Sequence, residues 1–269
     1  MLDINAGKPI AMLDNTRVYL GVVDPDLEPP KPKRRRTRGR NYDSDEEEEG
    51  ALFFDYPAPK KLYPVPDLNS RFVEYIAGPS GSGKSTMATN LAAEFRAVYP
   101  KIPILIFSRT KPEDDDAFAD LDGAIVIELN EKLIEQPVDI TKDPSFLEGS
   151  LLIFDDVSTV HSDAVKKEVN KLLTDAMEVG RKLNCNMIIT NHLVIPNEKK
   201  LARTIMNELN MLTVFPKCGS SQQIRYSLKT YFGLNNKQID GILSLKSRWV
   251  RICKSYPMFV LHEHGAYIL

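Results

Sequence analysis

The chain carries the segment Gly78-Pro79-Ser80-Gly81-Ser82-Gly83-Lys84-Ser85, from which its architecture follows. This segment fits Gly-x4-Gly-Lys-Ser, the Walker A loop that holds the phosphates of a nucleoside triphosphate. Glycines let successive backbone N–H groups point at one phosphate, and Lys84 adds a positive charge for the β- and γ-phosphates. Ser85 offers a hydroxyl to Mg²⁺, and a helix that begins here adds the positive end of its dipole. We therefore predict that residues 78–86, including Thr86, bind ATP.

The residues on either side of the loop support this interpretation. Before it, residues 72–77 form a β-rich run that ends at the first glycine. After it, the apolar residues fall at helical spacing, at Met87, Leu91, Phe95 and Val98. Strand, glycine loop and helix thus follow one another in the order that the motif requires.

A second motif lies farther along the chain, where the apolar run of residues 151–154 ends in Asp155 and Asp156. A fully apolar run is typical of a central parallel strand that is buried on both faces. Carboxylates at its carboxyl end would lie beside the phosphate loop, where open α/β sheets bind their ligands. We interpret this as a Walker B motif, in which Asp155 orients Mg²⁺ and Asp156 acts as general base toward the attacking water.

Further strands are predicted at residues 102–108 and 124–128, between the two motifs, and at residues 186–192 and 211–215 after them. We expect five parallel strands in all. A strand inserted between the phosphate-loop strand and the Walker B strand is typical of the ASCE branch of P-loop NTPases, which carry an extra catalytic acid. The predicted fold class is therefore an α/β P-loop NTPase of this branch, with a mainly parallel central sheet flanked by helices.

Polar residues end the strand at residues 186–192. Asn191 is our candidate for the side chain that senses the γ-phosphate or holds the water, with Thr190 and His192 as alternatives. Before that strand, residues 162–183 have the apolar spacing of an amphipathic helix of about six turns. Gly180-Arg181-Lys182 is expected at the end of this helix.

Composition places the chain among globular proteins. Its 269 residues are 42% hydrophobic and 27% charged, enough apolar material for one packed domain. The longest apolar runs have the length of strands, so we expect no membrane span. The three cysteines are far apart and odd in number, which favours a reducing compartment over a disulfide framework or a zinc site.

Charge is strongly segregated near the start of the chain. Residues 31–40 hold seven Lys or Arg, and residues 43–49 hold six Asp or Glu. Such blocks resist burial, so residues 1–61 are expected to be largely disordered apart from one or two strands near Asp3 to Val23. The ATPase domain would then cover residues 62–269. Residues 31–36 have the composition of a nuclear localisation signal, or else of a solvated basic tail.

These motifs together resemble the HerA/FtsK superfamily, and within it the genome-packaging ATPases of large DNA viruses, the poxvirus-type group. The resemblance covers about residues 70–255 and rests on the two Walker motifs, on residues 106–109 and 180–182, and on Arg203 with residues 214–216. Two positions depart from the family: it commonly has Glu where this chain has Asp156, and it often has Gln where this chain has Asn191. Both changes keep the chemical type of the side chain.

The resemblance implies a ring-shaped homo-oligomer that moves double-stranded DNA with ATP and Mg²⁺ and packages a viral genome into a capsid, with capsid proteins as partners. It also implies an arginine donated in trans, for which Arg181 is our candidate and Arg203 and Arg109 are rivals. Such a protein would be found in the virion and in the infected host cell, in its cytoplasm or nucleus.

The distribution of charge agrees with a nucleic-acid partner. Residues 199–269 hold eleven Lys or Arg against three acids, whereas residues 110–160 hold three against fourteen. A basic surface attracts phosphates, and Lys217, Arg225 and Lys229 are the candidate DNA-binding residues. No base-reading motif is present, so we expect contacts to the DNA backbone without sequence specificity.

Two other functions stay open at this point. One is a helicase-like ATPase on single-stranded nucleic acid, whose bases would stack on aromatic side chains. The other is a nucleotide-switched binding protein, in which slow hydrolysis resets a conformation. Stimulation of hydrolysis by duplex DNA, by single strands or by a protein partner separates the three.

Overall fold

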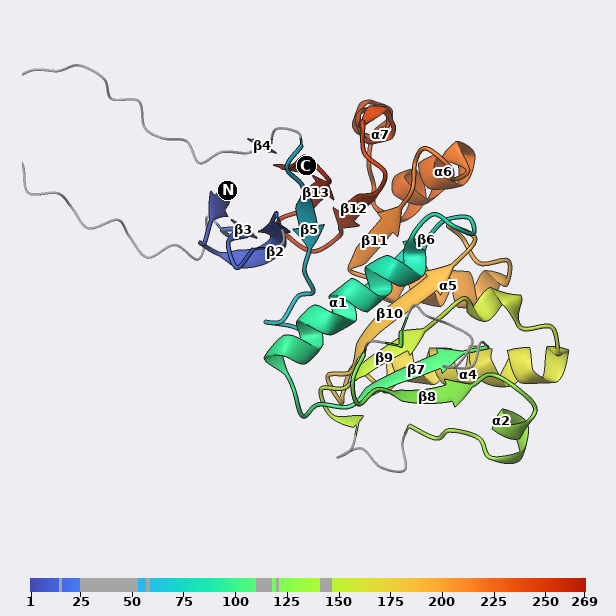
Figure 1. Cartoon of the computed structure of the whole chain (residues 1–269). Helices are drawn as coiled ribbons and strands as arrows, with labels where there is room; N and C mark the ends of the chain where they lie inside the picture. The colour runs from blue at the N-terminus through green and yellow to red at the C-terminus, as the bar shows by residue number, and fades with distance from the viewer. Residues whose placement is uncertain (15, 25–52, 57–58, 110–117, 120, 141–146) are drawn as a thin grey trace, which may run out of the picture.

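The computed structural model describes residues 1–14, 16–24, 53–56, 59–109, 118–119, 121–140 and 147–269 (Figure 1). The basic block, the acidic block and the candidate nuclear localisation signal all lie outside these ranges. No helix within them is long and apolar enough to cross a membrane.

A ten-stranded sheet forms the centre of the molecule. Its strands are β4 (Phe53–Asp55), β6 (Val73–Ala77), β7 (Ile104–Ser108), β8 (Ile125–Glu128), β9 (Leu151–Phe154), β10 (Asn186–Asn191), β11 (Met211–Val214), β12 (Val250–Cys253), β13 (Phe259–His262) and β14 (Gly265–Ile268). The strand order is β4-β14-β13-β12-β11-β6-β10-β9-β7-β8. Neighbours from β11 to β8 run parallel, and neighbours from β4 to β11 run antiparallel.

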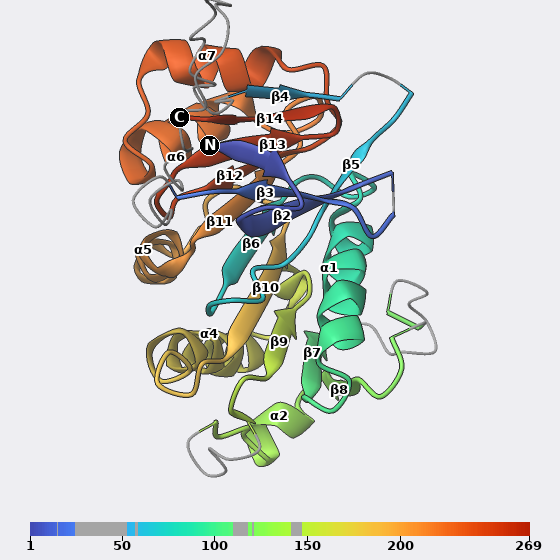
Figure 2. The ribbon, with the colours of Figure 1, turned by 90° about the vertical axis from the view of Figure 1, so that its left-hand side faces the viewer.

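Helices cover both faces of this sheet (Figures 1 and 2). They are α1 (Lys84–Val98), α2 (Lys132–Glu135), the short 3-10 helix η1 (Val157–Thr159), α4 (Asp163–Glu178), α5 (Lys199–Glu208), α6 (Ser221–Tyr231) and α7 (Asn236–Ser244). Helices α4 to α7 share a core cluster with one face of the strands. Helix α1 lies in a second cluster on the other face.

The start of the chain forms a smaller antiparallel sheet of its own. Its strands are β1 (Leu2–Ile4), β2 (Lys8–Leu13), β3 (Tyr19–Val22) and β5 (Leu62–Pro64), in the order β1-β3-β2-β5. This sheet packs in the same core cluster as α1. Between Asp3 and Val23 the sequence suggested one or two strands, whereas the described residues there take part in three.

The parallel strands confirm the interpretation of the apolar runs. Every residue of β6, β7, β9, β10 and β11 is buried, because helices or the small sheet cover both faces. The expected total of five parallel strands was one too low: the described residues form six, one for each of the six segments that the sequence predicted. The antiparallel strands β12 to β14 were not predicted.

The sheet order confirms the ASCE branch but identifies a different inserted strand. In space, β10 lies between β6, which leads into the phosphate loop, and β9, which leads into Asp155. The strands that lie between the motifs in sequence, β7 and β8, pair on the far side of β9. The end of β10 therefore lies between the phosphate loop and the paired acids Asp155 and Asp156.

Helix α4 is shorter than the apolar pattern predicted, because it ends at Glu178. A side chain at Gly180 would place its Cβ 2.0 Å from the carbonyl oxygen of Ala176, so only glycine fits this turn. The Gly180 carbonyl instead accepts the N–H of Cys185 at 2.8 Å, which starts the path into β10. Arg181 consequently lies in a turn after the helix.

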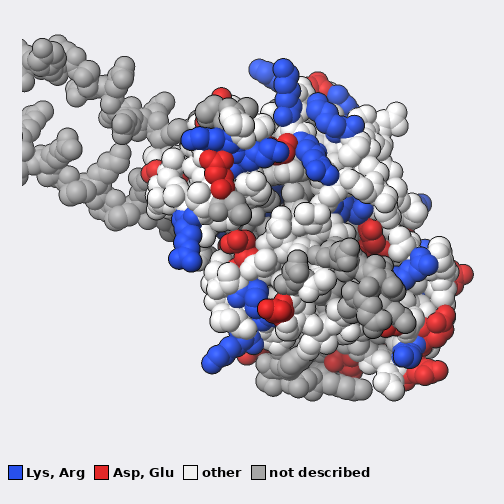
Figure 3. Space-filling model, in the orientation of Figure 1, with Lys and Arg blue, Asp and Glu red and all other residues white. Residues whose placement is uncertain are grey.

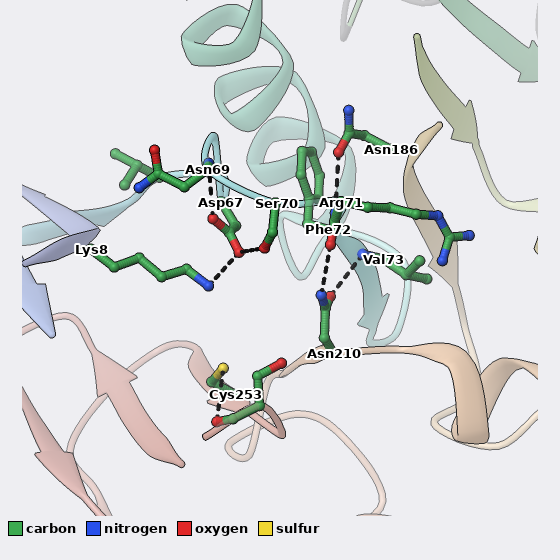
Figure 4. A network of polar contacts seen from close by, with 12 residues as sticks. Lys8, Asp67, Asn69, Ser70, Arg71, Phe72, Val73, Asn186, Asn210 and Cys253 are labelled. Atoms are coloured by element: carbon green, nitrogen blue, oxygen red, sulfur yellow. Dashed lines mark hydrogen bonds and ion pairs between the residues drawn. The ribbon is translucent and has the colours of Figure 1, made fainter. Parts of the chain in front are cut away.

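Polar side chains hold the start of β6 in register with its neighbours (Figure 4). The amide oxygen of Asn186 accepts the N–H of Phe72 at 3.1 Å, and that of Asn210 accepts the N–H of Val73 at 2.7 Å. On the other side, Lys8 of the small sheet forms an ion pair with the buried Asp67. The strand that ends in the phosphate loop is thus fixed from both sheets.

A buried ion pair also crosses the middle of the large sheet. Glu74 of β6 and Arg251 of β12 are fully buried, and Arg251 Nη2 donates to Glu74 Oε2 at 2.6 Å. The other carboxylate oxygen accepts the Thr213 hydroxyl of β11 at 2.7 Å. Arg251 Nη1 donates to the carbonyl of Val65, just after β5, at 2.7 Å. One charged pair therefore connects three strands and the segment that follows the small sheet.

We predict that Glu74→Gln lowers the free energy of unfolding by about 3–5 kcal/mol, because it leaves the Arg251 guanidinium buried without its counter-charge. Urea denaturation followed by circular dichroism measures this loss. The double variant Glu74→Gln/Arg251→Met removes both charges and should recover most of it. Equal stability of Glu74→Gln and the wild type would contradict the account of this pair.

Candidate nucleotide-binding site

The phosphate loop runs from the end of β6 to the start of α1. Gly83 has φ of 105°, which favours glycine, and Lys84 is the first residue of the helix. Gly78 is closely covered, since a Cβ there would lie 2.7 Å from both the Phe215 ring and Ser82 Oγ. The N–H of Gly78 donates to the carbonyl of Asn191 at 3.0 Å, so the loop begins against the end of β10.

The two loop residues expected to act on phosphate and metal point toward the paired acids. Lys84 is buried, and its Nζ lies 3.3 Å from the Pro79 carbonyl oxygen and 3.6 Å from Asp156 Oδ1. Ser85 Oγ lies 3.5 Å from Asp155 Oδ1. A hydroxyl and a carboxylate at this distance are the hard oxygen ligands that Mg²⁺ takes together with phosphate oxygens.

Asp155 and Asp156 follow β9 with different conformations. Asp155 is buried, and its N–H continues the strand by donating to the Phe107 carbonyl at 2.9 Å. Asp156 has φ of 42° and ψ of 40°, a left-handed conformation that costs a residue other than glycine about 1–3 kcal/mol. Strain of this kind is often found at functional sites. The turn leaves the Asp156 carboxylate 3.4 Å from His192 Nε2 and partly open to solvent.

Thr190 of β10 joins the two acids. Its hydroxyl donates to Asp155 Oδ1 at 2.8 Å and accepts the N–H of Asp156, also at 2.8 Å. It is fully buried, so this pair of bonds is shielded from water. The hydroxyl thereby fixes the first carboxylate and supports the left-handed backbone of the second.

Asn191 lies differently from its two alternatives. Its side-chain oxygen accepts the N–H of Leu193 at 3.0 Å, which shapes the turn after β10. The structure therefore brings Thr190 and His192, rather than Asn191, into contact with the acids. The sensor role of Asn191 stays a prediction. The sequence could have favoured Thr190 only if the register of β10 on β9 had been known.

The three candidate arginines lie apart from one another. Arg181 is exposed in the turn before β10, at the amino ends of the parallel strands, whereas the phosphate loop follows the carboxyl end of β6. Arg109 follows β7 and donates to the Thr159 carbonyl at 3.1 Å, and Arg203 is exposed on α5. Within the described ranges, none of the three forms a hydrogen bond or ion pair with Lys84 or with Asp156. An action across a subunit interface stays a prediction for each.

The candidate DNA-binding residues lie on the surface beyond the antiparallel strands. Lys217 follows β11, and Arg225 and Lys229 are exposed on α6. Figure 3 shows Lys and Arg gathered over the upper part of this face, where α6 and α7 lie. Arg225 is also paired with Asp240 of α7 at 2.5 Å, so its charge is partly balanced.

Not all basic residues of the C-terminal part contribute to that surface. Arg251 is fully buried in its pair with Glu74. Lys254 donates to the Met206 carbonyl at 3.0 Å, and partial burial lowers the pKa of its ammonium group. The basic surface is therefore smaller than the charge count of residues 199–269 suggests.

Comparison of the sequence with known proteins gives a family and a relative. Residues 75–211 match the model of the ATPase family associated with various cellular activities (AAA). An uncharacterized protein, V3, of the Sputnik virophage is 40% identical over 206 residues, which cover 77% of this chain and 80% of that protein.

Solved structures share the fold at low sequence identity. One is B204, the DNA-packaging ATPase from Sulfolobus turreted icosahedral virus, with a TM-score of 0.52, 11% identity, and coverage of 73% of this chain and 98% of that one. Another is the pCW3 conjugation coupling protein TcpA, with a TM-score of 0.51, 14% identity, and coverage of 94% and 76%. The resemblance to packaging ATPases and HerA/FtsK-like proteins is thus confirmed for the fold.

We predict that Thr190→Val, which replaces the hydroxyl by a methyl group, lowers ATP turnover by roughly 10- to 100-fold while ATP binding is kept. The range corresponds to about 1.5–3 kcal/mol, the contribution of a hydrogen bond to a charged group. Steady-state hydrolysis and equilibrium binding of a fluorescent ATP analogue measure the two effects. Thr190→Ser, which keeps the hydroxyl, is the control and should stay near the wild type. Wild-type turnover by Thr190→Val would show that this hydroxyl does not position the acids.

Proposed function

This chain belongs to the AAA family of ATPases, and we propose that it is an ATP-hydrolysing motor that translocates double-stranded DNA and packages a viral genome into its capsid. The observation that carries the proposal is the fold shared with B204, a DNA-packaging ATPase, over 98% of that chain. The virophage relative agrees with a viral setting. The nucleotide site described above would supply the energy.

The residues of the site divide the work of hydrolysis. The loop amides and Lys84 bind and neutralise the β- and γ-phosphates. Ser85 and Asp155 would hold Mg²⁺, which supplies charge stabilisation when bound. Asp156 accepts a proton from the attacking water, and its closeness to Lys84 and His192 orients its carboxylate. Asn191 lies where the loop meets β10 and would sense the γ-phosphate.

The DNA would lie against the basic surface of Lys217, Arg225 and Lys229. These side chains are exposed, and lysine and arginine contacts to phosphates do not depend on base sequence. We further propose that the chain forms a ring of identical subunits, in which Arg181 of one copy reaches the nucleotide of the next. Capsid proteins complete the assembly in the virion and in the infected cell.

A second candidate function is supported by one surface feature. Tyr226 of α6 is 55% exposed and lies between Arg225 and Lys229 in sequence, with its ring 6.4 Å from that of Tyr231. Exposed aromatic rings among basic residues suit the stacking of unpaired bases. A helicase-like ATPase on single-stranded nucleic acid is therefore the alternative. Whether duplex DNA or single strands stimulate hydrolysis more strongly decides between the two functions.

We predict that duplex DNA raises ATP turnover several-fold at low salt, and that the stimulation weakens as salt rises because phosphate contacts release counterions. Hydrolysis is measured without DNA, with duplex DNA and with single strands, alongside a mass measurement in ATP. Lys84→Ala should abolish turnover under all conditions. Greater stimulation by single strands would favour the helicase-like alternative, and stimulation by neither would remove the motor proposal.

A charge variant locates the DNA surface in the same assay. Lys217→Ala/Arg225→Ala/Lys229→Ala should keep basal turnover and lose most of the stimulation. Its matched control is Lys101→Ala/Lys132→Ala/Lys171→Ala, which removes three exposed charges from other elements and should be stimulated like the wild type. Equal stimulation of both triple variants by duplex DNA would show that the DNA does not bind at Lys217, Arg225 and Lys229.

The proposed ring makes a prediction for Arg181, because an arginine that acts in trans can be supplied by another copy. Arg181→Ala and Lys84→Ala should each be nearly inactive alone and regain activity when mixed. Turnover of the mixture at constant total protein measures this recovery. Parallel mixtures with Arg109→Ala and Arg203→Ala test the rivals. An Arg181→Ala variant with normal turnover would exclude its role.

A further inference from the structure

A cavity of about 420 Å³ lies beside the phosphate loop. Its walls come from the phosphate loop and from α1 as far as Glu94, from Phe215 after β11, from the segment just before β12, from Glu263 after β13, and from β2 and β5 of the small sheet. The volume lies within the range of about 300–1,000 Å³ that is usual for small-ligand sites. Neither Asp155 nor Asp156 lines this cavity.

The cavity and the acids lie on opposite sides of the loop strand. In the sheet, β6 has β10 and then β9 on one side, and β11 and then β12 on the other. Asp155 and Asp156 follow β9, whereas the cavity is lined by Phe215 after β11 and by Arg248 and Trp249 before β12. Lys84 and Ser85 face the acids, so the γ-phosphate end of a bound triphosphate lies on that side. The nucleoside end must then leave the loop on the cavity side.

Arg248 is placed between the loop and the cavity. Its Nε donates to the carbonyl of Ser82 at 3.1 Å, and its Nη2 is 3.3 Å from the point that a Cβ on Gly83 would occupy. A side chain at residue 83 would therefore crowd the guanidinium. In the part of the chain that the structure describes, no hydrogen bond or ion pair engages the two terminal nitrogens of Arg248. They remain free to donate to a ligand in the cavity.

The backbone of Arg248 is held from the other side. Its N–H donates to Glu263 Oε2 at 2.6 Å, and Lys61 Nζ lies 3.3 Å from Glu263 Oε1. Burial raises the pKa of the Glu263 carboxyl, but hydrogen bonds from the Arg248 amide and from Lys61 outweigh this and leave its pKa below the usual value. The carboxylate thus stays charged near neutral pH and fixes the arginine beside the loop.

We infer that this cavity receives the base and ribose of the bound nucleotide, and that Arg248 of the same chain contacts the nucleotide where it leaves the loop. The inference rests on the proposed ATPase function of the loop. It gives the small N-terminal sheet a part in the nucleotide site, because Met12, Tyr63 and Pro64 form one wall of the cavity. Apolar and aromatic walls with a few polar groups are typical of sites for small organic ligands.

The test compares ATP with tripolyphosphate, which has the phosphates but no nucleoside. Asn90 is exposed on α1 and lines the cavity, so Asn90→Phe fills the space without disturbing the core. We expect Asn90→Phe to bind ATP at least tenfold more weakly while its affinity for tripolyphosphate stays within about twofold of the wild type. Ala97→Phe, at an exposed position of the same helix outside the cavity, is the matched control and should bind both ligands normally.

Arg248 is tested in the same titrations. Arg248→Ala should weaken ATP binding by on the order of tenfold, the scale of a charge-assisted hydrogen bond, and Arg248→Lys should restore part of it. Normal ATP affinity in Asn90→Phe would overturn the inference, and so would an equal loss for ATP and tripolyphosphate. Failure of the wild-type chain to bind either ligand would instead remove the proposed function of the loop.

Discussion

The buried pair of Glu74 and Arg251 is the interaction on which the rest of the structure depends. A charge inside a sheet is costly unless it is paired with an opposite charge and hydrogen-bonded. Glu74 lies on the strand that presents the phosphate loop, and its carboxylate bonds to Thr213 on one neighbouring strand and to Arg251 on the next. A slip of one residue in any of these strands would turn a polar side chain to the other face and break the set. The antiparallel half of the sheet is thereby tied in fixed register to the half that carries the site.

Fixed register is also what brings the two halves of the site together. Residues Asn191 and Ala77 are direct partners across β10 and β6, and Ile189 is the partner of Phe154 across β10 and β9. Thr190 is the next residue of β10 after Ile189, just as Asp155 is the next residue after Phe154, and this register brings the Thr190 hydroxyl to both acids. Its two hydrogen bonds, each worth about 0.5–3 kcal/mol, are of the size needed to offset the strained backbone of Asp156. The position of the second acid thus depends on a strand that is distant in sequence.

How far the sequence predicts this molecule depends on how local each signal is. The phosphate loop, the apolar strands and the paired acids could be predicted, because each is a short run of sequence. The residue types within that run are enough to meet its physical requirement, whether phosphate binding, burial or metal binding. The choice of Asn191 over Thr190 could not be settled, since adjacent strand residues face opposite ways and only the pairing with β9 tells which faces the acids. The small N-terminal sheet was underestimated because its strands are short and β5 pairs with β2 across a long stretch of chain.

The count of charges along the sequence was the least reliable guide to a DNA-binding surface, because the basic residues of the C-terminal part have different structural roles. Lys217 and Lys229 are exposed and can attract phosphates, whereas Arg251 is buried and stabilises the core. Arg248 lies three residues before Arg251, at the entry to the same strand, and meets the phosphate loop. Since the ion pair of Arg251 fixes that strand in the sheet, it also fixes where Arg248 stands. The interaction that stabilises the fold therefore positions a charged side chain against the phosphate loop, through a strand of only four residues.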